Sequence, residues 1–180
     1  MALFTHPTSA PAPVLVAETW TPEGTLVSQR YWALEGAIVL VYIADADRAL
    51  AKHAVACLGC TYGAATNAVH NPMSETDAAK AANAHAAGCR AIPRGVPARP
   101  DDTEAADMIR TRLWARRYGK TPHPVRICDF NAIRVDLQRP TDWIKALLTD
   151  LTQSDAGFLT ATPTSSGQGI RFTVQPFARH

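Results

Sequence analysis

The chain has 180 residues, of which 47% are hydrophobic and 19% are charged. This composition excludes a disordered chain, and the length is sufficient for one domain with its own hydrophobic core. The formal net charge of +2 is too small to indicate a nucleic-acid or membrane partner by itself. Lys and Arg are concentrated in residues 90–140, where eleven of them stand against six Asp and Glu. This local excess of positive charge favours an anionic partner for the middle of the chain.

The N-terminal residues show no targeting signal. Pro7, Pro11 and Pro13 predict a loosely ordered arm over residues 1–13, with no basic region followed by an apolar run and a cleavage site. The longest apolar run, residues 37–44, is far shorter than the roughly 20 residues that cross a bilayer. We therefore expect a cytoplasmic protein with no membrane partner, and the sequence does not indicate its oligomeric state.

The next residues predict an N-terminal β meander over 14–44. Residues 14–20 and 26–34 are rich in β-forming side chains, and the turn at Pro22 to Gly24 separates them. Residues 37–43 form a continuous apolar run, which is typical of a strand buried on both faces. These three strands are expected to pair in antiparallel fashion.

Two helices are predicted after the meander. Asp45 or Asp47 can cap a helix over residues 48–58, because a short carboxylate accepts hydrogen bonds from first-turn amides. The Ser-x-x-Asp sequence that begins at Ser74 is a capping box, and it predicts an alanine-rich helix over about 75–87.

The rest of the chain alternates between helical and strand-like patterns. Residues 92–102 contain several prolines and predict a linker, and a helix is expected over roughly 104–118. The last third predicts strands, then a helix, then a hairpin, over residues 125–137, 143–152, 158–162 and 170–177.

These elements together predict a single α+β domain over residues 1–180. It consists of antiparallel N-terminal strands over 14–44, a helical zinc-binding segment over 45–91 and a proline-rich linker over 92–102. A C-terminal α/β segment over 103–180, with a β-α-β-β unit, completes it.

Three of the four cysteines lie at spacings typical of a metal site. Cys57, Cys60, His85 and Cys89 form the sequence C-x2-C-x24-H-x3-C. A C-x2-C pair lets one tight turn direct two sulfurs at the same ion, and side chains four apart on a helix project from one face. In a reducing compartment such cysteines are metal ligands rather than disulfides. The sequence therefore predicts a closed, structural Zn²⁺ site with these four ligands.

This ligand order resembles the general zinc-finger pattern with C-C-H-C ligands, although the spacer of 24 residues is long for a compact finger. A second resemblance is carried by His53, Cys57 and Cys60, which form an H-x3-C-x2-C run similar to the fingerprint of zinc-containing anti-sigma factors. That resemblance implies an all-helical domain in which His53 is a ligand in place of His85 or Cys89. We favour the later pair, because it completes a set of four without His53.

The remaining candidate residues have simpler interpretations. Cys128 stands alone in a predicted strand and is expected in the core. The four tryptophans are expected to be core anchors: Trp20, Trp32, Trp114 and Trp143. No local run supplies a nucleophile, a base and an anion hole together, so we do not expect an enzyme.

The functional prediction combines the metal site with the basic segment. Arginine's planar guanidinium suits phosphate, so the best candidates for nucleic-acid contacts are the cations near residues 110–120, namely Arg110, Arg112, Arg116, Arg117 and Lys120. We expect a zinc-stabilised nucleic-acid-binding protein with a regulatory or accessory role. The alternative is a protein-interaction adaptor or inhibitor in which zinc orders the surface that a protein partner recognises.

Overall fold

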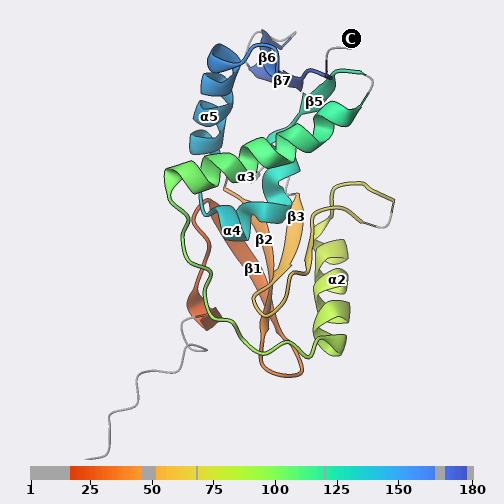
Figure 1. The fold of residues 1–180 in the computed structure, drawn as a ribbon. Helices are drawn as coiled ribbons and strands as arrows, with labels where there is room; N and C mark the ends of the chain where they lie inside the picture. The colour runs from red at the N-terminus through yellow and green to blue at the C-terminus, as the bar shows by residue number, and fades with distance from the viewer. Residues whose placement is uncertain (1–16, 46–51, 68, 120, 165–168, 178–180) are drawn as a thin grey trace, which may run out of the picture.

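The structure is a computed structural model that describes residues 17–45, 52–67, 69–119, 121–164 and 169–177. Its N-terminal half is built on a four-stranded antiparallel sheet with the strand order β1-β2-β3-β4 (Figure 1). The strands are β1 (Thr25–Trp32), β2 (Ile38–Ala44), β3 (His53–Cys57) and β4 (Gly63–Ala64).

Strand β2 is buried on both faces, as its apolar run predicts. Val39 and Val41 lie in one cluster of buried side chains, beneath helix α2 (Glu75–Gly88). Leu40 and Tyr42 lie in a second cluster on the opposite face, because successive side chains of a strand alternate between faces. The central strand therefore joins two hydrophobic cores.

Helix α2 packs against the sheet through small side chains. Ser74 caps it by accepting a hydrogen bond from the Asp77 amide at 3.1 Å, as the capping box predicts. Its buried residues are Ala78, Ala82 and Ala86, spaced so that they share one face. Alanine side chains let the helix lie close to β2 and β3.

The C-terminal half contains a second, three-stranded antiparallel sheet with the strand order β5-β7-β6. Helices α3 and α5 pack against it around a separate core (Figure 1). The helical elements are α3 (Asp102–Trp114), η1 (Ala115–Tyr118), η2 (Ile127–Ile133), α4 (Arg134–Leu137) and α5 (Thr141–Ser154). The strands are β5 (His123–Val125), β6 (Leu159–Pro163) and β7 (Ile170–Val174).

A partly buried polar network joins the two halves. The Asp45 carboxylate, at the end of β2, accepts hydrogen bonds from the Thr141 amide at 3.2 Å and from the Thr141 hydroxyl at 2.5 Å. The fully buried Arg134 guanidinium donates to the Thr141 hydroxyl at 2.8 Å and to the Arg139 carbonyl at 2.9 Å. The Asp45 side chain thus caps α5 from a position 96 residues earlier in the chain.

The α+β fold class is confirmed, while several element predictions are wrong. Residues 53–57, assigned to a helix over 48–58, form β3, because pairing with β2 decides the structure of a short apolar run. Residues 17–19, assigned to a strand, are helical. After β5, residues 127–137 form η2 and α4 instead of strands.

Some predictions fall outside the described residues. These include the N-terminal arm, the first residues of the expected strand at 14–20, Asp47 and residues 48–51 of the expected helix over 48–58. Among the described helices, none has the length and apolar character needed to cross a membrane.

Candidate metal centre

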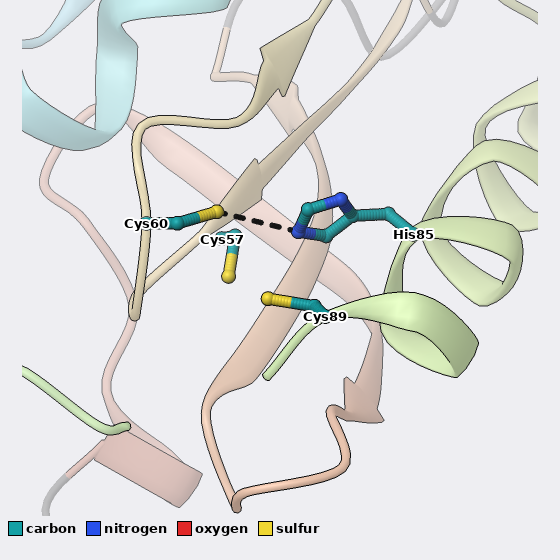
Figure 2. A group of neighbouring side chains, drawn as sticks. All are labelled: Cys57, Cys60, His85 and Cys89. Atoms are coloured by element: carbon teal, nitrogen blue, oxygen red, sulfur yellow. Dashed lines mark hydrogen bonds between the residues drawn. The ribbon is translucent and has the colours of Figure 1, made fainter. Parts of the chain in front are cut away.

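The four predicted ligands come from two neighbouring parts of the fold. Cys57 is the last residue of β3, and Cys60 lies in the turn that follows. His85 lies in the last turn of α2, and Cys89 caps the end of that helix. Figure 2 shows the four side chains pointing toward a common centre. The packing of α2 on β3 therefore brings together residues that are far apart in the sequence.

The geometry suits a tetrahedral metal ion. The three sulfurs and one imidazole nitrogen all lie within 4.8 Å of one another. The Cys60 Sγ and the His85 Nε2 are 3.4 Å apart (Figure 2). A tetrahedron with Zn–S near 2.3 Å and Zn–N near 2.0 Å has a sulfur-to-nitrogen edge of about 3.5 Å. The four residues can hold a metal ion with small movements of their side chains.

Backbone amides support the sulfurs of the cysteine turn. The Gly59 amide donates to the Cys57 Sγ at 3.4 Å, and the Tyr62 amide donates to the Cys60 Sγ at 3.4 Å. Hydrogen bonds of this kind favour the thiolate form, which is the form that binds metals.

Gly59 lets the cysteine turn pack closely against its neighbours. A Cβ at this position would lie 2.4 Å from the Ala37 Cβ and 3.0 Å from the Ala91 Cβ. Glycine in a turn usually supplies backbone freedom. At Gly59 the requirement is instead for space, and sequence alone does not show it.

The His85 ring is oriented by an aromatic neighbour. The Tyr62 and His85 rings are stacked, with centroids 3.9 Å apart and an interplanar angle of 5°. Burial lowers the pKa of His85, which favours the neutral imidazole that coordinates metals. Tyr62 is a supporting residue that the spacing of the ligands does not reveal.

Comparisons of the chain with protein-family models, with curated proteins and with solved structures return no match.

His53, the rival ligand, lies at the opposite end of β3 from Cys57. Their backbones are four residue steps apart along the strand, which is about 13 Å at a rise of about 3.3 Å per residue. The His53 side chain is buried, and it is not part of the cluster of four. Since the cysteine pair follows a strand, the all-helical setting implied by the anti-sigma resemblance is also missing at this point of the chain.

Burial raises the pKa of the Cys57 thiol to about 11. The thiol therefore keeps its proton at neutral pH unless a cation displaces it. Metal binding at this site is expected to release that proton, because the thiolate is the ligand.

The arginines proposed for phosphate contacts differ in their surroundings. Arg112 donates to the Asp129 carbonyl at 2.8 Å, and Arg116 forms an ion pair with the Asp129 carboxylate at 2.8 Å. Arg117 lies over three aromatic rings, while Arg110 is exposed and pairs with Asp107 at 3.4 Å. The structure thus commits Arg112 and Arg116 to internal contacts, and Lys120 lies outside the described residues.

Two expectations about individual side chains are wrong. Trp32 and Trp114, expected in the core, are 54% and 44% exposed. Cys128 lies in η2 and not in a strand, and the Lys52 Nζ is 3.6 Å from its sulfur.

Proposed function

We propose that Cys57, Cys60, His85 and Cys89 bind one Zn²⁺ ion and that the ion has a structural role. Three thiolates and one imidazole form a donor set that zinc prefers. The observation that carries the proposal is that these four ligand atoms all lie within 4.8 Å of one another. Four protein ligands leave no coordination position for substrate. When bound, the ion would fasten the cysteine turn to the C-terminal end of α2.

Metal analysis of the purified protein tests this proposal. We expect about one zinc per chain in the wild-type protein and a large loss of zinc in Cys60→Ser. The matched control is Cys128→Ser, which removes a half-buried cysteine outside the cluster and should leave the metal content unchanged. Zinc well below one equivalent in the wild-type protein, or equal loss in both variants, would contradict a site at these residues.

We further propose that the protein binds nucleic acid, in a regulatory or accessory role, through a surface at the end of α3 and η1. This surface, the aromatic face, consists of Trp114, Arg117, Tyr118 and Phe177, and it lies against the buried ring of Phe158. The Tyr118 and Phe177 ring centroids are 5.5 Å apart, and Tyr118 is 76% exposed. Exposed rings can stack with bases, and this is the observation that supports the proposal.

The aromatic face also carries a positive charge. The Arg117 guanidinium carbon lies 4.4 Å from the Phe177 ring centroid and 4.8 Å from the Trp114 ring centroid. No acidic side chain forms an ion pair with Arg117 within the described part of the chain. A cation held among aromatic rings combines phosphate attraction with base stacking.

Fluorescence anisotropy with a labelled single-stranded oligonucleotide tests the proposal. Tyr118→Ala should weaken binding by about 1–3 kcal/mol, which is the usual contribution of one stacked base. Trp32→Ala, which removes an exposed aromatic side chain from β1, should leave the affinity unchanged. Absence of binding by the wild-type protein at low salt would refute the proposal.

A protein-interaction adaptor remains the second candidate, and one observation favours it. Leu34 and Ile92 are 58% and 73% exposed, and the Leu34 amide donates to the carbonyl of the metal ligand Cys89 at 3.1 Å. A bound metal would therefore order a backbone next to exposed apolar side chains. Recovery of one stoichiometric protein partner after nuclease treatment, dependent on Leu34, would support this role over nucleic-acid binding.

A further inference from the structure

A cavity on the C-terminal half is lined by basic side chains. It lies between α5 and the sheet of β5 and β7, and its volume of about 720 Å³ is within the range of small-molecule sites. We call it the basic pocket, and its main lining residues are Val125, Arg126, Lys145, Thr149, Arg171 and Phe172.

Three different elements each contribute one cation to the basic pocket. Arg126 follows β5, Lys145 lies on α5 and Arg171 lies in β7. Arg126 and Arg171 are exposed, and neither forms an ion pair within the described residues. Lys145 pairs with Asp142 at 3.2 Å, but both side chains are more than half exposed, so the pair is weak.

Negative charge is missing from the lining of this cavity. Among the described residues that line it, none is Asp or Glu. The floor is apolar, because Val125 and Phe172 belong to the C-terminal core. A ligand that fits this lining has an anionic group for the cations and an apolar part for the floor.

We propose that the basic pocket binds the phosphate of a nucleotide unit, supplied either by a single-stranded nucleic acid or by a free nucleotide. Two guanidinium groups suit phosphate oxygens through their planar forks. The sugar or base would lie on Val125 and Phe172. The nucleic-acid form of this inference rests on the proposed function, whereas the nucleotide form does not.

The position of the basic pocket would allow one single-stranded nucleic acid to reach both the basic pocket and the aromatic face. Strand β5 adjoins both regions: Val125 lines the basic pocket, and the carbonyl of Pro124 accepts a hydrogen bond at 3.4 Å from Arg116, the residue before Arg117 of the aromatic face. In Figure 1, β5 lies next to the C-terminal end of α3. A single strand crossing β5 would contact both surfaces.

The test compares two double variants that remove equal charge. Arg126→Gln with Arg171→Gln should weaken binding of a labelled oligothymidylate at least tenfold. The slope of log affinity against log salt should also fall by about 1.4, because each phosphate contact on a single strand contributes about 0.7. Lys80→Gln with Arg99→Gln, both exposed and outside the basic pocket, should change neither quantity to that extent.

The outcomes separate this inference from the proposed function. If the pocket variant binds the oligonucleotide as strongly as the wild-type protein does, the assignment of the basic pocket is refuted and the nucleic-acid function is not. The same conclusion follows if both double variants are weakened equally. Binding of AMP or inorganic phosphate that depends on Arg126 and Arg171, without oligonucleotide binding, supports the pocket and refutes the nucleic-acid function. The phosphate assignment is overturned if the protein binds none of these probes. It is also overturned if polyglutamate displaces a bound probe and its own binding depends on Arg126 and Arg171.

Discussion

At Gly59 the metal site depends on the absence of a single methyl group. We expect Gly59→Ala to lower the free energy of unfolding by about 1–3 kcal/mol, because its Cβ would clash with the Ala37 and Ala91 side chains. It should also weaken zinc binding, since the Gly59 amide supports the Cys57 sulfur. Urea unfolding and zinc competition with a chelator measure the two effects.

Gly88 provides the matched control for this substitution. It lies in the last turn of α2, close to the same ligands, but a Cβ there meets no atom within 4 Å. Gly88→Ala should therefore be neutral or stabilising by up to about 1 kcal/mol, because alanine favours a helix more than glycine does. Equal destabilisation by both substitutions would show that close packing at Gly59 is not the cause.

The buried Cys57 thiol predicts a pH dependence of the metal-free protein. Its pKa is about 11 in the folded state and 9.0 for an ordinary thiol, so between these values the folded state binds more protons than the unfolded state. Stability should therefore fall as the pH rises from about 9 to 11. Urea unfolding at several pH values, with chelator present, measures this loss. Cys57→Ala should show a smaller loss over the same range, and an identical loss would assign the effect to other groups.

Among the helices, α5 depends on a cap that is distant in sequence. Pro140 precedes it without a side-chain cap, and the Asp45 carboxylate accepts the first amide hydrogen bond. Asp45→Ala should lower the free energy of unfolding by about 0.5–2 kcal/mol, as for other helix caps. Asp142→Ala is the control, because Asp142 lies on the same helix but is 93% exposed, and its change should be within about 0.5 kcal/mol. Equal effects in thermal or urea unfolding would contradict the capping role of Asp45.

Whether an element is specified by local residues or by contacts with distant parts of the chain explains which elements the sequence predicts. Helix α2 and strand β2 are predictable, because Ser74 and the apolar run of residues 38–44 carry their signals locally. Strand β3 is not, since its five buried residues fit a helix or a strand until they pair with β2. The four clustered ligands follow from their spacing, whereas Tyr62 and Gly59 matter only through neighbours that the fold supplies.

Over the whole molecule, the core beneath α2 and the C-terminal core differ in what holds their helices. Helix α5 buries Ile144, Leu148 and Leu151 in the C-terminal core. Helix α2 buries only alanines, whose three methyl groups contribute on the order of 2–3 kcal/mol at about 0.8 kcal/mol each. Zinc coordination is worth about 10–16 kcal/mol in isolated zinc-binding peptides. A bound ion would therefore be the main attachment of α2 to the sheet.

Metal removal should consequently loosen one half of the molecule and spare the other. With chelator present, we expect faster amide hydrogen exchange in α2 and in the turn after Cys57, because His85 and Cys89 no longer fasten the helix. Exchange in α5 and β7 should change little, since their core contains none of the four ligands. Cys60→Ser should reproduce the effect without chelator, and Cys128→Ser should not. Uniform acceleration across both halves would instead show that the Asp45 and Arg134 network makes the molecule a single cooperative unit.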